Sequence, residues 1–140
     1  MRRKDDRVFV DTGAWIALAL ANDPLHERAR LAWERLRGSG ARLFTSIPVI
    51  IETFTFLDRN TTRNVAIAWK NAVADLPRVV DVLECRGADL KAAWAVIETT
   101  NLHKLSLVDA ISFALMSREG LRAAFAFDHH FASAGFRLVD

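Results

Sequence analysis

The stretch Val8-Phe9-Val10-Asp11-Thr12-Gly13 decides the fold of this chain. Three β-prone apolar residues are followed by a carboxylate, a hydroxyl and a glycine, and then by the apolar run Ala14 to Leu18. A short continuous apolar run is typical of a buried parallel strand, so this pattern predicts a strand, a turn and a helix. Ligands of open α/β sheets bind outside the carboxyl ends of such strands, which makes Asp11 a candidate site residue. Alternatively, Asp11 or Thr12 only caps the following helix.

The remainder of the chain alternates short apolar runs with segments whose apolar residues recur at helical spacing. Strands are predicted over residues 42–45, 79–83, 123–127 and 136–139. Helices are predicted over residues 24–37, 46–57, 62–75, 88–99, 110–120 and 129–135. Asp23 before Pro24 predicts the start of the first of these helices, and Ser46 the cap of the second. This alternation implies βαβ units, and therefore an α/β fold with a mainly parallel sheet and helices on both faces.

The length of 140 residues favours one domain, residues 1–140, without a linker or an internal repeat. Cys85 is the only cysteine, which excludes an internal disulfide and fits a reducing cytoplasm. A basic start followed by the apolar residues 14–21 superficially resembles a signal peptide, but Asp5, Asp6 and Asp11 interrupt it. The apolar part is also too short to span a membrane. We therefore expect a cytoplasmic protein without a membrane segment.

Three further acids occupy positions where a carboxylate needs an explanation. Glu52 lies in an almost wholly apolar helical segment, where burial is costly unless the group is paired, protonated or metal-bound. Alternatively, Glu52 faces solvent at the helix edge. Asp109 fits a capping box that begins at Ser106, with aspartate in place of the usual glutamate. Asp128 follows the apolar residues 123–127 and either serves a site at the end of that strand or caps the next helix.

Taken together, the acids indicate a metal site. Asp11 and Asp128 both follow apolar strands, which in a parallel sheet places them at the same edge. Asp109 begins the helix that leads to the last of these strands, so it should lie near that edge. Converging carboxylates repel one another unless a cation neutralises them, and oxygen ligands of this kind select Mg²⁺ or Mn²⁺ rather than zinc. Phosphoryl transfer to water is the reaction best served by such a cluster.

The charge distribution is compatible with a polyanionic substrate. The net charge is +2, and with four acids gathered in one site the rest of the chain carries 13 acidic against 19 basic residues. Fifteen of these basic residues are arginines, whose side chains grip phosphates bidentately. The alternative is an ordinary mixed surface without a specific polyanionic partner.

Four segments of the chain resemble PIN-domain ribonucleases in order and spacing: Phe9-Val10-Asp11-Thr12-Gly13-Ala14, Ile51-Glu52, Leu105-Ser106-Leu107-Val108-Asp109-Ala110 and Ala126-Phe127-Asp128-His129-His130-Phe131. The length and the closing segment are most similar to the VapC-type toxins of bacterial toxin–antitoxin pairs. This resemblance covers essentially the whole chain. It implies a three-layer α/β/α fold around a five-stranded parallel sheet, and Mg²⁺- or Mn²⁺-dependent cleavage of RNA. It also implies a homodimer whose activity is held in check by a cognate antitoxin.

The same resemblance assigns roles to particular residues. Asp11 and Asp109 would be the principal metal ligands, and Glu52 a further ligand or the residue that positions the attacking water. Thr12 and Ser106 would orient the cluster by hydrogen bonding, as polar groups next to metal ligands commonly do.

The fourth acid, Asp128, would bind a second ion or support the other ligands. Many members of the family carry a hydroxyl residue two positions before this acid, and the present chain has Ala126 there. Of the four acids, Asp128 is therefore the one whose role is affected by this departure from the family pattern.

Three other interpretations fit the pattern less well. His129 and His130 are adjacent and His103 lies far upstream, a spacing that does not predict a zinc site. Surface or packing roles are expected for them, or contact with substrate by His129 or His130. An aspartyl-phosphate phosphatase would carry a second acid two residues after Asp11, where this chain has Gly13. A PIN-like domain that binds RNA or protein without cleaving would lack one or more of the four acids, and all four are present.

Overall fold

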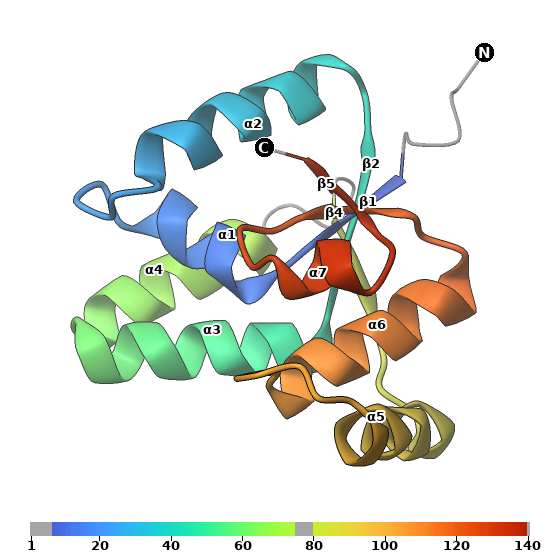
Figure 1. Cartoon of the computed structure of the whole chain (residues 1–140). Helices are drawn as coiled ribbons and strands as arrows, with labels where there is room; N and C mark the ends of the chain where they lie inside the picture. Colours follow the sequence, from blue (N-terminus) through green and yellow to red (C-terminus); the bar gives the residue numbers. More distant parts are fainter. Residues whose placement is uncertain (1–6, 75–79, 140) are drawn as a thin grey trace.

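The computed structural model describes residues 7–74 and 80–139 and contains one five-stranded sheet between two layers of helices (Figure 1). The strands are β1 (Arg7–Val10), β2 (Arg42–Ser46), β3 (Val80–Leu83), β4 (Ala123–Phe125) and β5 (Arg137–Val139). The helices are α1 (Thr12–Ala19), α2 (His26–Gly38), α3 (Ile47–Asn60), α4 (Arg63–Ala74), α5 (Gly87–Thr99), α6 (Leu107–Glu119) and α7 (His130–Ser133). All neighbouring strands are parallel. The predicted α/β/α class with a parallel sheet is confirmed.

The strand order is β3-β2-β1-β4-β5, so the chain changes direction across the sheet after β3. From β1 the chain passes through β2 to the edge strand β3, and α5 and α6 then carry it back to β4 on the other side of β1. Right-handed crossovers therefore put α1 to α4 on one face of the sheet and α5 to α7 on the other (Figure 1). The carboxyl ends of β1 and β4 flank the switch point, where ligands bind in sheets of this kind.

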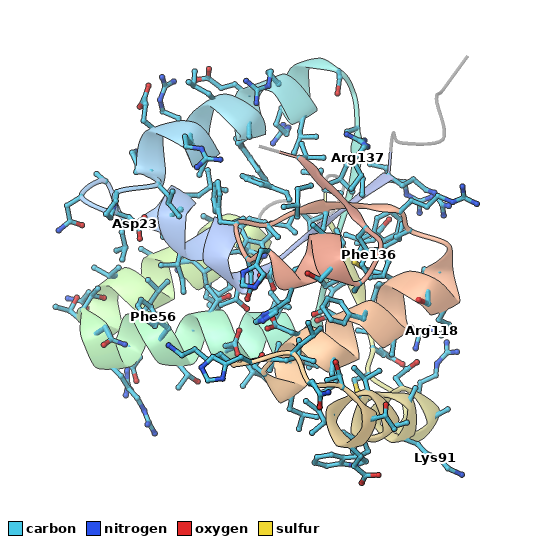
Figure 2. All side chains as sticks on the ribbon, viewed as in Figure 1. Asp23, Phe56, Lys91, Arg118, Phe136 and Arg137 are labelled. Atoms are coloured by element: carbon cyan, nitrogen blue, oxygen red, sulfur yellow. The ribbon has the colours of Figure 1, made fainter. Side chains whose placement is uncertain are left out.

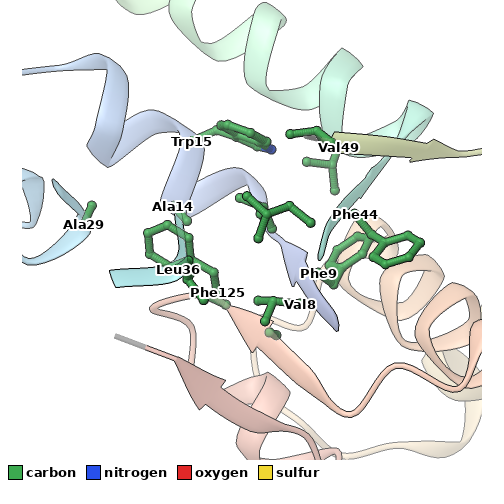
Figure 3. Packing of buried hydrophobic residues seen from close by; sticks show 14 of the residues in the cluster. Val8, Phe9, Ala14, Trp15, Ala29, Leu36, Phe44, Val49 and Phe125 are labelled. Carbon is green, nitrogen blue, oxygen red and sulfur yellow. The ribbon is translucent and has the colours of Figure 1, made fainter. Parts of the chain in front are cut away.

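Strand β1 lies at the centre of both the sheet and the hydrophobic core (Figure 3). Its residues Val8, Phe9 and Val10 are at most 1% exposed. A buried hydrogen-bond chain fixes the end of the strand, because Trp15 Nε1 donates to Thr45 Oγ1 (3.1 Å) and this hydroxyl donates to the Val10 carbonyl (3.0 Å). The residue that follows β1 therefore leaves a rigid, well-packed position.

Helix α2 begins at His26, two residues later than predicted. Asp23 Oδ1 accepts a hydrogen bond from the Leu25 amide (2.8 Å), and the His26 amide donates to the Asp23 carbonyl (2.9 Å). These bonds close a turn ahead of the helix, so Asp23 stabilises that turn and is not the helix cap. Ser46, in contrast, caps α3 as predicted, because its side chain accepts a hydrogen bond from the Val49 amide (3.2 Å).

Strand β4 ends at Phe125, two residues earlier than predicted, because its central neighbour β1 offers no partner beyond that residue. Its pairing with β1 stops at Val10 opposite Phe125, and its pairing with β5 stops at Val139 opposite the same residue. After Val10 the neighbouring chain turns into α1, and the Asp11 amide donates to the Phe125 carbonyl (3.0 Å). Asp128 therefore lies beyond the strand and does not directly terminate it.

The other predicted helices are present, with ends that differ by at most three residues. Helix α3 extends to Asn60, α6 begins at Leu107 and α7 ends at Ser133. Residues 75 and 79, at predicted ends of a helix and a strand, lie outside the described residues, as does the leader-like start at residues 1–6. Within residues 7–74 and 80–139, none of the helices is long and apolar enough to cross a membrane.

Helices α5 and α6 are joined by an ion pair between Asp89 and Arg118, which is labelled in Figure 2. Asp89 is only 5% exposed, and its Oδ2 also accepts a hydrogen bond from the Arg86 amide (2.8 Å). Arg118 Nη2 donates to the Glu84 carbonyl (3.2 Å), which ties the end of α6 to the segment before α5. These bonds fix the position of α6, whose first turn carries Asp109.

Candidate active site

Asp11 lies at the end of β1, in the N-cap position of α1, and is 4% exposed. Its side chain makes no capping hydrogen bond, so the capping interpretation of this residue is wrong. The buried Asp11 Oδ1 atom and the buried Thr12 Oγ1 atom beside it have no hydrogen-bond partner among the described residues. A buried polar oxygen without a partner is costly, and here it marks a place for a group from outside the chain.

The four predicted acids, Asp11, Glu52, Asp109 and Asp128, form one electrostatic group, the acid cluster. Burial raises the pKa of Asp11, and the negative charge of Asp109 adds to it, followed by those of Glu52 and Asp128. The Thr12 backbone amide works in the opposite direction, yet the pKa reaches about 7. The structure therefore brings the other three carboxyl groups close enough to oppose the ionisation of Asp11.

Asp109 both caps a helix and belongs to the acid cluster. Its amide donates to Ser106 Oγ (3.0 Å), and its Oδ2 accepts a hydrogen bond from the Ser106 amide (3.4 Å), which is the predicted capping box of α6. Burial raises the pKa of Asp109, the charges of Asp128 and Glu52 raise it as well, and the hydrogen bonds from Ser106 oppose them. The capping box holds this carboxyl group at the edge of the cluster.

Glu52 reaches the cluster from α3 on the opposite face of the sheet. It is half-buried, and its charge raises the pKa of both Asp11 and Asp109. Glu52 also lines an apolar cleft on α3 together with Ile51 and Phe56, which is labelled in Figure 2. The effect of its charge on Asp11 and Asp109 favours the predicted site position over the alternative in which Glu52 only faces solvent.

Asp128 lies in the turn between β4 and α7, and its side chain is 34% exposed. Its Oδ1 accepts a hydrogen bond from the His130 amide (2.9 Å), so Asp128 does cap the first turn of α7. The same oxygen lies 2.9 Å from His130 Nδ1. Asp128 also raises the pKa of Asp11 and Asp109 by its charge, so capping and membership of the cluster coexist here too.

His130 is the site residue that sequence reasoning missed, since only surface, packing or substrate-contact roles were expected for the histidines. Its side chain is 4% exposed and lies between two acids, with Nδ1 2.9 Å from Asp128 Oδ1 and 3.8 Å from Asp109 Oδ2. Its Nε2 lies 2.8 Å from the His103 carbonyl oxygen. One sequence signal could have identified His130: it stands two residues after Asp128, an acid predicted to cap the helix. At this spacing the histidine ring can turn back toward the acid. His129, in contrast, is 81% exposed.

The environment of His130 favours its charged form in the metal-free chain. Burial lowers the pKa of this imidazole, but the His103 carbonyl and the charges of Asp128 and Asp109 outweigh it, so the net direction is upward. Even so, Nδ1 is buried without an acceptable hydrogen-bond geometry to any partner among the described residues. The 2.9 Å approach to Asp128 Oδ1 is a close pairing of the imidazole with a carboxylate.

Two arginines lie next to residues that neighbour members of the acid cluster. The Arg28 guanidinium, on the first turn of α2, lies 5.3 Å from the centre of the Phe127 ring, immediately before Asp128 in the chain. Arg59 lines the same cleft as Glu52. Basic side chains of this kind near an acidic centre suit an approaching phosphate backbone.

The donor set fits a metal ion. Carboxylate oxygens are the ligands preferred by Mg²⁺ and Mn²⁺, and the Asp11 Oδ1 oxygen has no other partner in the described structure. Donor atoms of Asp128, His129 and His130 also lie within 4.8 Å of one another. A cation would relieve the repulsion that raises the pKa of Asp11.

The fold and the acid cluster together define the class of this protein. Residues 8–137 match the family model of the PIN domain, and the chain belongs to that family.

Within that family the chain is similar to the 23S rRNA-specific endonuclease VapC20 of Mycobacterium tuberculosis, in strains CDC 1551 / Oshkosh and ATCC 25618 / H37Rv. Each of these is 38% identical over 130 residues, which cover 92% of this chain and 95% of the relative. The crystal structure of M. tuberculosis VapC20, described as a sarcin–ricin loop cleaving toxin, matches with a TM-score of 0.82 and 35% identity over 92% of this chain and 95% of that one.

A more distant structure shows that the fold persists at low identity. VapBC2 from Rickettsia felis, bound to a DNA fragment from its promoter, matches with a TM-score of 0.68 and 9% identity over 94% of this chain and 96% of that one. The predicted resemblance to PIN-domain ribonucleases of the VapC type is confirmed by the family match and by the VapC20 relatives.

Proposed function

We propose that this chain is a metal-dependent endoribonuclease that hydrolyses phosphodiester bonds of 23S rRNA at the acid cluster, with Mg²⁺ or Mn²⁺ as the ion. The observation that carries the proposal is Asp11, a buried carboxyl group at the switch point with a pKa of about 7 and an oxygen without a partner among the described residues. The substrate class rests on the 38% identity to a 23S rRNA-specific endonuclease. Such a substrate also supports a cytoplasmic location, where ribosomes are found.

In this mechanism the residues of the chain hold the ion and the RNA. Asp11 and Asp109 would be the principal ligands, and Glu52 would bind the ion or orient the attacking water. When bound, the ion would activate that water and stabilise the charge that develops on the phosphate. Ser106 fixes the Asp109 carboxyl group through the capping box, and the buried Thr12 hydroxyl can orient Asp11.

Asp128 and Arg28 would lie where the RNA approaches the site. Asp128 would bind a second ion or hold the other ligands in place, and its partly exposed side chain is accessible from solvent. Arg28, next to Phe127, places a guanidinium where a phosphate can approach Asp128. Arginine is suited to this contact because its planar fork binds phosphate oxygens in pairs.

We also propose that the chain acts as a homodimer and is inhibited by an antitoxin. Support for a second copy comes from helix α3, where Ile47, Ile51 and Phe56 are 44%, 60% and 39% exposed. Trp94 on α5 is 46% exposed as well. Large exposed apolar side chains of this kind are typical of protein interfaces. Light scattering after size exclusion should give twice the chain mass of 15.7 kDa, and Ile51→Glu should give the monomer mass.

The experiment that tests the proposed reaction uses purified protein, free of any antitoxin, and three RNAs. These are a hairpin with the sarcin–ricin loop sequence, the same hairpin scrambled, and a transfer RNA. Each is incubated with Mg²⁺, with Mn²⁺ or with EDTA, and Asp11→Asn is compared with the parent. Asp81→Asn is the matched control, because Asp81 lies on β3 with a 43% exposed side chain that pairs with Arg42.

Discrete cuts in the first hairpin that require metal, disappear in Asp11→Asn and persist in Asp81→Asn would support the proposal. Cuts that persist in Asp11→Asn would refute the assignment of the site. A folded parent that binds RNA without cutting any of the three substrates would instead favour a PIN-like module that binds RNA or protein without catalysis.

A further inference from the structure

We propose that His130 supplies a nitrogen ligand to the ion of the acid cluster through Nδ1, and that the site consequently prefers Mn²⁺ over Mg²⁺. This inference rests on the proposed function, since it concerns the same ion. It goes further in two ways. It adds a histidine to the four acids as a ligand, and it states which of Mg²⁺ and Mn²⁺ the site prefers.

The tautomer of His130 follows from its contact with the loop before α6. Nε2 lies 2.8 Å from the His103 carbonyl oxygen, and a carbonyl oxygen can only accept a hydrogen bond. Nε2 therefore carries the proton, and the neutral ring has its lone pair on Nδ1. Histidines that bind metals commonly show this arrangement, in which the second ring nitrogen donates to a carbonyl group that fixes the ring.

The position of Nδ1 suits a shared ion. It is 2.9 Å from Asp128 Oδ1 and 3.8 Å from Asp109 Oδ2, so three donor atoms from two helix starts and a turn converge. Two adjacent ligands of an octahedral ion are separated by about 3 Å when the bonds are near 2.1 Å. The pair formed by Nδ1 and Asp128 Oδ1 has this spacing.

Burial provides an independent reason to assign a ligand role. The side chain of His130 is 4% exposed, and Nδ1 has no hydrogen-bond partner of acceptable geometry within the described part of the chain. Asp11 Oδ1 is buried without a partner in the same way. A cation bound by Nδ1 would satisfy that atom, and any proton on it would leave as the ion binds, as at other metal sites.

The nature of the donor predicts the ion. Magnesium binds almost only oxygen ligands, whereas imidazole nitrogen is a better ligand for transition-metal ions. A set of carboxylates with one imidazole therefore favours Mn²⁺ over Mg²⁺. His129 is a weaker candidate for the nitrogen, because it is 81% exposed and its Nδ1 lies 3.8 Å from Asp128 Oδ1.

The decisive measurement detects nitrogen on bound Mn²⁺ without RNA. Electron spin-echo envelope modulation of the Mn²⁺-loaded protein should show coupling to a directly bound nitrogen, and labelling with ¹⁵N-histidine should change it. His130→Gln should abolish this coupling, because the glutamine amide can still donate to the His103 carbonyl but offers no donor at the Nδ1 position. His129→Gln is the matched control and should keep the coupling. Calorimetry should show that His130→Gln weakens Mn²⁺ binding by about tenfold or more, with Mg²⁺ binding nearly unchanged.

The outcomes separate this inference from the proposed function. Nitrogen coupling that is lost in His130→Gln and kept in His129→Gln would support the inference. Mn²⁺ that binds and sustains RNA cleavage without nitrogen coupling would overturn the inference alone, as would coupling that disappears only in His129→Gln. A parent protein that binds neither Mn²⁺ nor Mg²⁺ and cuts no RNA would overturn both. The isotope experiment needs no substitution: if His130→Gln does not fold, the absence of an isotope effect would overturn the inference, and an isotope effect that persists in His129→Gln would support it by excluding the other histidine next to Asp128.

Discussion

Replacing Asp11 by asparagine should make the metal-free protein more stable above neutral pH, although it removes a predicted metal ligand. Burial, and then the charges of Asp109, Glu52 and Asp128, raise the pKa of this carboxyl group from its ordinary value of 3.8 to about 7. The folded chain therefore holds a proton that the unfolded chain loses between pH 4 and pH 7. The free energy of unfolding falls as the pH rises through this window and levels off above it.

The size of this effect follows from the shift. Each pH unit inside the window lowers the stability of the parent by about 1.4 kcal/mol. Two such units lie between pH 5 and the pKa of about 7, so the parent should lose roughly 3 kcal/mol between pH 5 and pH 8 through Asp11 alone. Asp11→Asn has no carboxyl group at this position and should not show this loss. Groups that titrate in both chains, such as His130, largely cancel in the difference between them.

The assay is urea unfolding in EDTA at pH 5, 6, 7 and 8, followed by circular dichroism. The stability of Asp11→Asn minus that of the parent should grow by roughly 3 kcal/mol over this range, while Asp81→Asn should follow the parent. Saturating Mn²⁺ or Mg²⁺ should then stabilise the parent more than Asp11→Asn, because only the intact cluster binds the ion well. A difference that does not change with pH would show that Asp11 ionises normally and that the four acids do not act as one electrostatic group.

Three further substitutions probe the surroundings of this carboxyl group. Mn²⁺ or Mg²⁺ should raise the melting temperature of Glu52→Gln less than that of the parent. Equal rises in the two proteins would show that Glu52 only faces solvent. Ser106→Ala should lower the free energy of unfolding by about 1 kcal/mol through loss of the cap. It should also slow RNA cleavage, because Asp109 is no longer held in place. An unchanged cleavage rate at full metal loading would show that Ser106 does not position Asp109. Arg118→Met should destabilise the chain by about 3 kcal/mol in urea unfolding, since it leaves Asp89 buried without its partner, and a loss below about 1 kcal/mol would contradict this.

Much of this architecture was predictable because it depends on local sequence. The run Val8 to Val10 is buried in the central strand, and the alternation of strands and helices predicts a parallel sheet with helices on both faces. The positions of Asp11 and Asp109 follow from that topology, since an acid after a central strand and an acid at a helix start meet at one edge. Ser46 caps α3 as its sequence context indicates.

The features that sequence missed depend on contacts between distant segments. Strand β4 stops at Phe125 because β1 turns into α1 beyond that point, and no property of residues 126 and 127 themselves reveals it. The role of His130 depends on the His103 carbonyl, which is far away in sequence and reaches the ring only in the folded chain. Helix α2 starts late because the Asp23 side chain stabilises a turn instead of the helix, and both outcomes fit the same residues.

The choice between capping and catalysis, which the sequence posed for Asp11, Asp109 and Asp128, is not a real alternative for the last two. Asp109 and Asp128 cap α6 and α7 and also contribute charge to the cluster. Capping anchors these carboxyl groups, and backbone amides at helix starts offset part of their mutual repulsion. The offset is incomplete, because the pKa of Asp11 remains about 7 even with the Thr12 amide beside it. The remaining repulsion is what the cation of the proposed function would remove.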